Sequence, residues 1–386
     1  MSKTTNRIIT ALFSVFIGGF FLLNLLLPDK DFSEKENRQL QTLPKFSFSS
    51  LFSGSFATRF ESYCSDQFAG RDTWIETKAG AELAQGKQQN NGVFLCDGGR
   101  LIEPFEAPEE DVLARAVQAA DLLTDTGVPV SLALIPTTAQ LYADILPDGA
   151  PNDDQQAVIN SAYAQTALET IDLSSTLTAH SSEYIFYRTD HHWTALGAYY
   201  AYTAFCESAG LKAEPLSKFE SGEYTGFLGS LYSAIKAYPQ SQALADNPDT
   251  VQFWRPFVDL DTKWYPDAEF SMEYFGGTLC KVDDTSNKYL TFLGGDHPIT
   301  VIKTNVDGPV CMILKESYGN AFTPWLTSHY SKIIAIDPRE FNRDGKPSLD
   351  LAAFAKEQGV NDCIVLDYPI MLNSDSYITW LERLVD

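Results

Sequence analysis

The sequence has few basic residues. It contains 28 Lys and Arg residues against 51 Asp and Glu residues, which gives a net charge of −23 over 386 residues. A surface with this balance repels a phosphate backbone, so nucleic acid is excluded as a partner. Apolar residues still make up 44% of the chain and aromatic residues 13%. That content is enough to bury a sizeable core, which excludes wholesale disorder.

Cysteine is also scarce, and its spacing argues against a metal knuckle. None of the six cysteines forms a CxxC pair, the usual spacing of zinc ligands in such knuckles. Cys311 and Cys363 lie inside apolar runs and are expected to be free thiols in the core. Disulfides among the others are possible if the chain is exported, and the sequence leaves their pairing open.

Long hydrophobic runs are missing with one exception. The mean hydropathy of −0.15 excludes a protein with many membrane spans, but residues 8–27 (IITALFSVFIGGFFLLNLLL) carry no charge. A helix of this length reaches across a hydrocarbon core of about 30 Å. Lys3 and Arg7 precede the run, which predicts a single-pass anchor with the rest of the chain outside the cytoplasm. The alternative is a cleaved signal peptide, whose apolar region is usually shorter and ends in small residues that are missing here.

The net charge differs in sign between the N-terminal segment that contains the anchor and the rest of the chain. Residues 1–30 contain Lys3, Arg7 and Lys30 against Asp29, a net charge of +2, which leaves −25 for residues 31–386. We interpret the acidic surface as a device for solubility. It makes a neutral or zwitterionic glycan easier to accommodate than a heavily anionic polymer.

The pattern predicts three segments: a cytosolic tip and anchor over residues 1–30, a polar stalk over 31–50, and a catalytic domain over 51–386. The domain begins with aromatic residues at helical spacing (Phe52, Phe56, Phe60 and Tyr63), which we expect to pack inward. Short apolar runs then alternate with helical patterns. Such alternation is typical of a parallel sheet covered on both faces, a three-layer α/β/α domain. Strands are expected at 92–95, 130–135, 184–187, 310–314, 333–336 and 363–366, and helices at 109–126, 155–179, 195–209 and 349–358.

Residues 214–306 interrupt this alternation. The segment is rich in Tyr, Phe, Gly, Pro and Asp and has strand-like pieces at 289–293 and 300–303. It predicts a β-rich insertion that shapes a cleft.

Two adjacent histidines are the first candidates for chemistry. Residues 187–194 (YRTDHHWT) join a short predicted strand to a helix N-terminus, the end of a strand where ligands bind in doubly wound sheets. Asp190 and His192 are two residues apart, so an extended loop can aim both side chains the same way. A carboxylate that accepts from an imidazole fixes its tautomer, which is the base half of a Ser-His-Asp unit. The alternative is that Asp190 caps the helix and the histidines pack as ordinary polar residues.

A serine at the end of a buried strand is the second candidate. Ser317 follows the strand at 310–314 within three residues. A strand-to-helix turn exposes a nucleophile near backbone N–H donors. The segment is not a GxSxG elbow, and Ser317 could simply cap the next helix.

Taken together, these segments resemble the bacterial DHHW protein family and, more widely, the alginate O-acetyltransferases AlgJ and AlgX, which have SGNH-hydrolase-like domains. The resemblance extends over nearly all of the exported chain, in the runs at 32–38, 66–74, 135–147, 190–193, 227–232, 294–298 and 316–319.

The resemblance implies roles for individual residues. Asp190, His192 and Ser317 correspond to the catalytic set, and His191 takes a supporting role. Gly295 and His297 are placed near the cleft, and the amides of Ser317 and Tyr318 are the natural oxyanion donors. The Gly-Asp-Ser of ordinary SGNH hydrolases is absent, because Lys315 and Glu316 precede the serine here.

The resemblance implies a serine-dependent O-acetyltransferase that acts outside the cytoplasm on a polysaccharide and needs no metal or other cofactor. Because acetyl-CoA is cytosolic, a membrane-bound O-acyltransferase partner would supply the acetyl group. Three alternatives stay open: a secreted carbohydrate esterase with the same triad, a non-catalytic glycan-binding or assembly protein, and a metal site of the DHH phosphoesterase kind at Asp190, His191 and His192. The sequence does not identify the polysaccharide, the acyl group beyond acetyl, or the oligomeric state.

Overall fold

The computed structural model describes residues 3–33, 38–236 and 238–385. The chain forms two compact units, one of residues 1–91 and 233–243 and the other of residues 92–232 and 244–386. Residues 34–37, which belong to the predicted stalk, lie outside the described residues.

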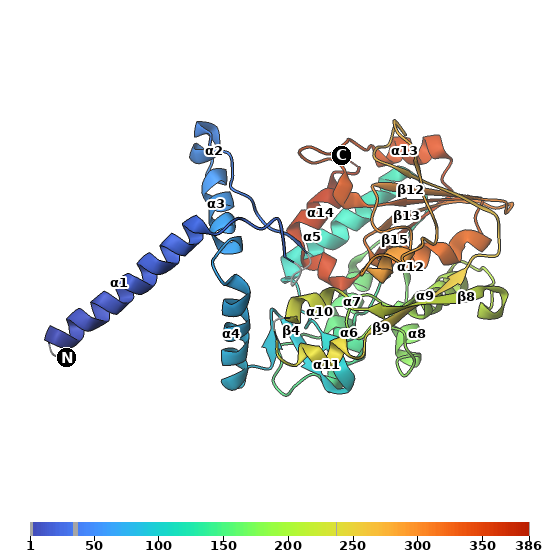
Figure 1. The fold of residues 1–386 in the computed structure, drawn as a ribbon. Coiled ribbons are helices and arrows are strands. Elements are labelled where there is room, and N and C mark those ends of the chain that lie inside the picture. Colours follow the sequence, from blue (N-terminus) through green and yellow to red (C-terminus); the bar gives the residue numbers. More distant parts are fainter. Residues whose placement is uncertain (1–2, 34–37, 237, 386) are drawn as a thin grey trace. The chain divides into compact units, whose positions relative to one another are not determined.

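The first unit is mainly helical and begins with the apolar segment. Helix α1 is long and apolar enough to cross a membrane and contains no buried residue. A signal sequence has the same features. The elements in the N-terminal part of this unit, coloured blue in Figure 1, are α1 (Lys3–Leu26), β1 (Phe32–Ser33), β2 (Arg38–Gln39), α2 (Phe48–Phe52), α3 (Ser55–Asp66), α4 (Arg71–Ala84) and β3 (Gln89–Asn90).

The aromatic stripe of this unit was expected to pack inward, but its residues are not buried. No residue of α3 is buried, and the side chain of Phe52 is 87% exposed. Other aromatic rings pack against α1 instead. Phe20 of α1 stacks on Phe68, with ring centroids 5.5 Å apart, and lies 5.7 Å from the ring of Trp74.

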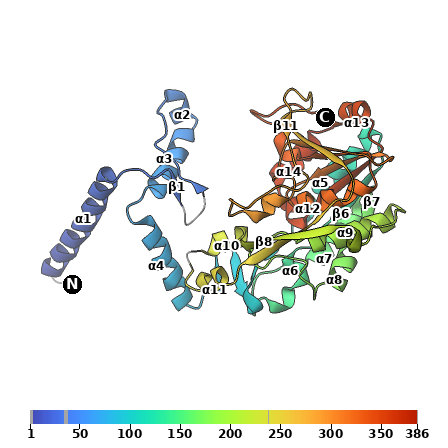
Figure 2. The same ribbon diagram turned by 45° about the vertical axis from the view of Figure 1, so that its right-hand side comes forward.

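The second unit is built on an eight-stranded mixed sheet, in the order β11-β10-β12-β14-β13-β15-β6-β7. The strands from β14 to β7 are parallel. The other three are antiparallel to their neighbours. The strands predicted at 130–135, 310–314, 333–336 and 363–366 are therefore parallel as expected, but the sheet as a whole is mixed. An apolar run reveals a buried strand but not its direction, and antiparallel edge strands on parallel sheets are common. The strands, seen from two sides in Figures 1 and 2, are β6 (Val130–Leu134), β7 (Glu169–Ile171), β10 (Leu260–Tyr265), β11 (Tyr274–Phe275), β12 (Ile299–Thr304), β13 (Val310–Lys315), β14 (Lys332–Ile336) and β15 (Asp362–Asp367).

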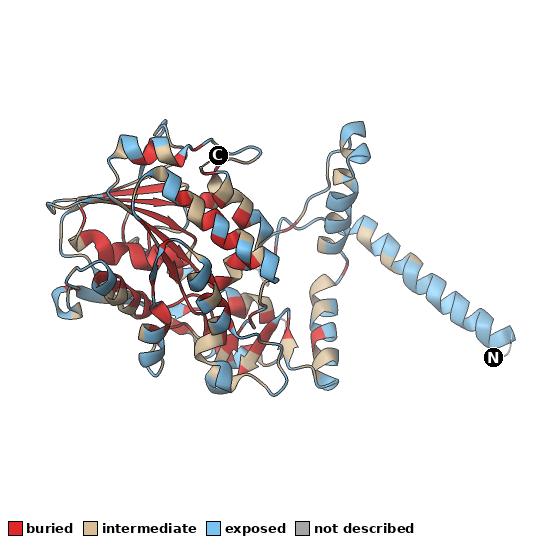
Figure 3. Ribbon diagram, turned by 180° about the vertical axis from the view of Figure 1, so that it is seen from behind, coloured by how far each residue is buried: buried red, intermediate tan, exposed pale blue. Residues whose placement is uncertain are grey.

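Alternate residues of the central strands enter two separate cores. Met312 and Leu314 of β13 join one hydrophobic cluster, whereas Cys311 and Ile313 join the other. This is the period-two pattern of a strand buried on both faces, and these strands are buried in Figure 3. The first cluster includes residues of α5 (Glu110–Asp121), α7 (Gln155–Gln165), α13 (Leu351–Gln358) and α14 (Asp375–Glu382), and the second includes residues of α8 (Leu173–Ala179), α9 (Ala195–Ser208) and α12 (Tyr318–Phe322).

Most predicted elements are found, with three local differences. The expected helix at 155–179 is divided into α7 and α8 by β7, and residues 184–187 form only an isolated bridge between Phe186 and Trp193. The expected strand at 289–293 is a 3₁₀-helix, Lys288–Thr291. All six cysteines are free, and Cys311 and Cys363 are buried as expected.

Residues 214–306, which were expected to form an insertion, contribute strands both to a separate ribbon and to the main sheet. β8 (Glu220–Phe227) and β9 (Asp249–Arg255) pair with each other as a separate antiparallel ribbon. Strands β10, β11 and β12 instead extend the main sheet. The remaining elements are β4 (Val93–Cys96) and β5 (Arg100–Ile102), which are antiparallel, and the short helices α6 (Thr138–Leu141), α10 (Ser230–Ile235) and α11 (Ser241–Ala245).

Candidate active site

Ser317 lies where the central strand β13 turns into helix α12. It occupies the N-cap position of α12, but its side chain makes no capping hydrogen bond. Its Oγ lies 2.7 Å from Nε2 of His192 instead. Ser317 is partly exposed, whereas Glu316 and Tyr318 on either side are buried. The capping alternative therefore gives way to a serine whose hydroxyl faces a histidine and solvent.

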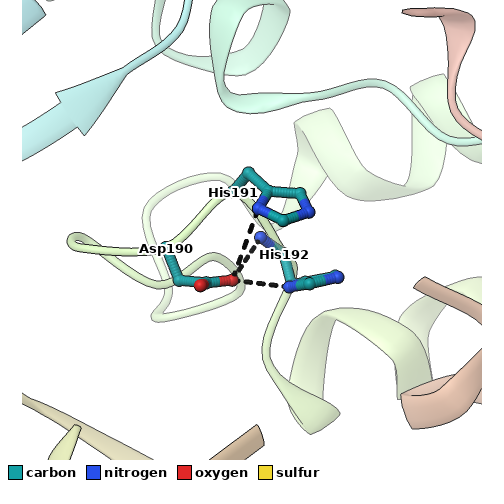
Figure 4. Close-up of side chains that lie close together, drawn as sticks. All are labelled: Asp190, His191 and His192. Carbon is teal, nitrogen blue, oxygen red and sulfur yellow. Dashed lines mark hydrogen bonds and ion pairs between the residues drawn. The ribbon is translucent and has the colours of Figure 1, made fainter. Parts of the chain in front are cut away.

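The other end of the same imidazole is held by Asp190. Nδ1 of His192 lies 2.5 Å from Oδ1 of Asp190, and the His192 backbone N–H donates to the same oxygen at 3.0 Å. Figure 4 shows the carboxylate of Asp190 facing both histidines. Oδ2 of Asp190 accepts from the backbone N–H of Ser230 at 2.7 Å. Asp190, His192 and Ser317 thus form one hydrogen-bonded chain.

Local structure fixes this loop at the start of α9. Phe186 and Trp193 bridge across the turn, and the side chain of Thr194 accepts from the Gly197 amide as the N-cap of α9. Below the loop, Asp249 is 1% exposed and accepts from both the amide and the hydroxyl of Thr189. The backbone before Asp190 is therefore anchored by a buried carboxylate.

The electrostatics favour an ionised Asp190. Burial alone would raise the pKa of its carboxyl, but the two neighbouring imidazoles and the hydrogen bonds from His192 and Ser230 outweigh burial and hold that pKa well below its usual range. An ionised Asp190 accepts the Nδ1 proton of His192, which leaves Nε2 free to accept from Ser317.

His191 lies against the imidazole of His192, with ring centroids 3.8 Å apart. Its Nδ1 is 2.6 Å from Oγ of Ser230. Burial and the adjacent His192 lower the pKa of His191 to about 4, so this ring is neutral at physiological pH. These contacts place His191 beside the imidazole of His192, and its supporting role stays a prediction.

Aromatic residues hold the other side of the site, among them Tyr289, which the sequence did not single out. The ring of Tyr289 stacks on His192 at a centroid distance of 4.0 Å, and its hydroxyl donates to the Ser317 carbonyl at 2.9 Å. The indole N–H of Trp193 donates to the Tyr318 carbonyl at 3.0 Å. The hydroxyl of Tyr318 donates to the carbonyl of His191. These contacts tie the histidine loop to the serine turn, although 125 residues separate His192 from Ser317.

Gly229 permits the close approach of the α10 segment to Asp190. A Cβ at this position would lie 2.3 Å from both Cβ and Oδ2 of Asp190, far inside van der Waals contact. The run at 227–232 was part of the resemblance, but nothing in its composition revealed this packing role.

The expected oxyanion donor is already engaged. The Tyr318 amide donates to Oε2 of Glu316 at 3.0 Å, and the Ser317 hydroxyl is 3.1 Å from the same oxygen. The Tyr318 N–H is therefore beside the nucleophile, as expected, but it is not free in this structure.

Gly295 and His297 lie farther along a different network. His297 stacks on Trp264 with ring centroids 3.9 Å apart, and in the described part of the chain it makes no hydrogen bond to Ser317 or His192. Asp296, between the two residues, accepts from Lys315 at 3.2 Å and from Asn320 at 2.8 Å. The run thus supports the strand before the serine, and its effect on the nucleophile is indirect.

Asp190, His191 and His192 are also the residues of the alternative metal site. Ligand atoms of Asp190, His191 and His192 lie within 4.8 Å of one another. However, Oδ1 of Asp190 bonds to Nδ1 of His192, and Nδ1 of His191 faces Ser230. Because these atoms hold one another, the arrangement fits proton transfer better than metal coordination.

These features define the class to which the chain belongs. A family model described as DHHW protein matches residues 124–336, more than half of the chain, and the chain therefore belongs to the DHHW family. The name corresponds to the run at 190–193 that carries Asp190 and His192.

Among curated proteins, the chain is similar to two proteins named probable alginate O-acetylase AlgJ. The protein from Pseudomonas putida is 26% identical over 269 residues, which cover 66% of this chain and 65% of the relative. The protein from Pseudomonas syringae pv. tomato is 27% identical over 193 residues, 47% of this chain and 44% of the relative. The matches thus span less than two thirds of each relative's length.

Solved structures show the same fold. A DHHW family protein from Eubacterium siraeum has a TM-score of 0.67 and 28% identity, covering 77% of this chain and 97% of that one. PatB1 from Bacillus cereus has a TM-score of 0.60 at 16% identity, covering 74% and 97%.

Proposed function

We propose that this chain is a serine-dependent O-acyltransferase that transfers an acetyl group to a polysaccharide outside the cytoplasm. The observation that carries the proposal is the hydrogen-bonded chain from Asp190 through His192 to Ser317, with distances of 2.5 Å and 2.7 Å. The names of the two AlgJ relatives support the acetyl group and the polysaccharide class. We further propose a three-layer SGNH-hydrolase-like arrangement for the second unit.

The first half-reaction forms an acyl-enzyme. His192 Nε2 accepts the Ser317 proton as Oγ attacks the carbonyl carbon of an acetyl ester. The carbonyl oxygen takes up the negative charge, and the backbone amides of Ser317 and Tyr318 are the candidate donors to stabilise it. As the tetrahedral intermediate collapses, the imidazolium returns the proton to the departing alkoxide. The ionised Asp190 stabilises the imidazolium throughout.

The second half-reaction reverses these roles. A sugar hydroxyl gives its proton to His192 Nε2 and attacks the acetyl carbonyl on Ser317, and the proton then returns to Oγ. If water attacked instead, the protein would be an esterase with the same groups. The ratio of acyl transfer to hydrolysis in the presence of an oligosaccharide decides between these outcomes.

Helix α1 fits this function as an anchor. We propose that it spans the cytoplasmic membrane and holds the second unit outside, beside a membrane-bound O-acyltransferase that supplies the acetyl group. Tethering raises the effective concentration of the serine near such a donor.

The test is covalent labelling of the full chain in detergent. After reaction with p-nitrophenyl acetate, the intact mass should increase by one acetyl group, and peptide mapping should place it on Ser317. Ser317→Ala and His192→Ala should lose the adduct, whereas Ser208→Ala, which removes an exposed hydroxyl at the end of α9, should keep it. A wild-type protein that never carries acetyl on Ser317 would rule out the covalent mechanism.

A further inference from the structure

A buried carboxyl group that the mechanism above does not use lies directly beside the nucleophile. Glu316 is 1% exposed. Its Oε2 accepts from the Tyr318 amide at 3.0 Å and lies 3.1 Å from Oγ of Ser317. This oxygen therefore lies next to the donor that the oxyanion needs, within hydrogen-bond reach of the atom that must attack.

The second carboxyl oxygen of Glu316, Oε1, is buried and lacks a hydrogen-bond partner among the described residues. The ammonium of the adjacent Lys315 is directed to Asp296 and Asn320, at 3.2 Å and 2.5 Å. An ionised carboxylate would thus bury an unpaired charged oxygen, which is far more costly than burying a neutral acid.

The surroundings of Glu316 also oppose a negative charge. Burial first, and then Asp367 on β15, raise the pKa of Glu316 to about 8, and the hydrogen bond from Tyr318 counteracts this only in part. Burial likewise raises the pKa of Asp367, to about 7. The charged and titratable groups that face Glu316 are Asp296, Asp367, Arg339, Tyr289, Tyr318, Tyr368 and Tyr377.

We propose that Glu316 is a positioning residue that works as a neutral acid, holding the Ser317 hydroxyl and the Tyr318 amide in place until an ester carbonyl takes over the amide. The inference rests on the proposed function, because it assumes that Ser317 is acylated. No bond of Glu316 breaks in the reaction, and its proton stays on the carboxyl group.

The neutral state matters for two physical reasons. A neutral carbonyl oxygen is a modest acceptor, so the Tyr318 N–H can leave it for the oxyanion at little cost, whereas a bond to a carboxylate is about twice as strong. An ionised Glu316 would also place a negative charge close to the oxygen where negative charge develops, which raises the barrier. It would further compete with His192 for the Ser317 proton.

The experiment is a pH profile of the acylation burst, measured on the full chain in detergent with p-nitrophenyl acetate. We expect the wild-type rate to fall above about pH 8, by about tenfold per pH unit. Glu316→Gln keeps the shape of the side chain and cannot ionise, so it should retain most of the neutral-pH rate and lose the alkaline decline. Glu357→Gln, the same change at an exposed position of α13, should keep the wild-type profile.

A second variant covers the case in which Glu316→Gln does not fold. Asp367→Asn removes the facing negative charge and can still accept from Tyr377, whose hydroxyl lies 2.6 Å away. It should move the alkaline decline to lower pH. The proposal is wrong if folded Glu316→Gln declines like wild type, if it is inactive at every pH, or if the midpoint does not move in Asp367→Asn. Absence of any acyl-Ser317 in wild type would instead reject the proposed function, and this inference with it.

Discussion

Replacing Gly229 by alanine should disable the site without altering any of its three central residues. The new methyl group would lie 2.3 Å from Oδ2 and 2.6 Å from Cγ of Asp190. Non-bonded carbon and oxygen atoms need about 3.3 Å or more, so the carboxylate or the backbone must move by about 1 Å. Asp190 is 4% exposed and is packed in a buried site, which leaves little room for that movement.

A displacement of this size has a calculable effect on the reaction. The Asp190–His192 contact is 2.5 Å long, and a shift of about 1 Å in a positioning group can lower a rate about 100-fold. We therefore expect Gly229→Ala to reduce the acylation burst by one to two orders of magnitude, with a smaller loss of thermal stability. The assay is the burst rate with p-nitrophenyl acetate, together with the melting temperature of the same preparation.

The matched control is Gly80→Ala in α4. A Cβ at Gly80 meets nothing within 4 Å, and its φ is not positive, so alanine should be neutral or slightly stabilising in that helix. If Gly229→Ala acylates at the wild-type rate, the close packing of this glycine on Asp190 does not position the base, and the reasoning fails.

Three further substitutions test the parts of the structure that hold the site. Asp249→Asn should cost about 3–5 kcal/mol of unfolding free energy, measured by denaturant titration, because Asp249 is 1% exposed and pairs with Arg188 at 3.1 Å. Gly197→Ala should cost about 1–3 kcal/mol in the same assay, since its Cβ would lie 2.4 Å from the Ile185 carbonyl oxygen. The pKa of Asp190 is lower in the folded protein than in the unfolded chain, where it is about 4. Ionised Asp190 therefore stabilises the fold at pH values above about 4, and this stabilisation is lost as the pH falls through the pKa of the folded state. Asp190→Asn should therefore be less destabilised by acid than wild type, which melting curves at falling pH will measure.

The sequence predicted the central strands well because burial on both faces leaves a simple signal. The apolar runs that became β6, β13, β14 and β15 were placed within one or two residues. The prediction from sequence was wrong where tertiary contacts decide the local conformation. Residues 289–293 have the composition of a strand, but the chain forms a 3₁₀-helix there and brings Tyr289 onto His192. Composition cannot show that contact, since the partners are far apart in sequence.

The candidate site was predicted in part, through residue types whose chemistry is recognisable. Residue types marked Asp190 with His192, and separately Ser317, as candidates near the ends of predicted strands. The resemblance to the DHHW family joined the three into one set, and the structure brings them together. Gly229 and Ser230 act through a backbone approach and an amide. Their roles depend on a fold that brings α10 against the histidine loop, and no local pattern encodes it.

Glu316 shows why charged residues beside a nucleophile are hard to interpret from sequence. A Lys-Glu pair at the end of a strand normally indicates a solvated turn, since both residue types are rarely buried. Here both are 1% exposed, and among the described residues Lys315 pairs with Asp296 whereas Glu316 forms no ion pair. A lone buried carboxyl is stable only as a neutral acid or as part of a strained site. Two neighbouring residues can thus be buried for opposite reasons, Lys315 because it is paired and Glu316 because it can give up its charge. The alkaline limb of the acylation profile measures the charge of Glu316, because ionisation of this buried carboxyl is what should slow acylation.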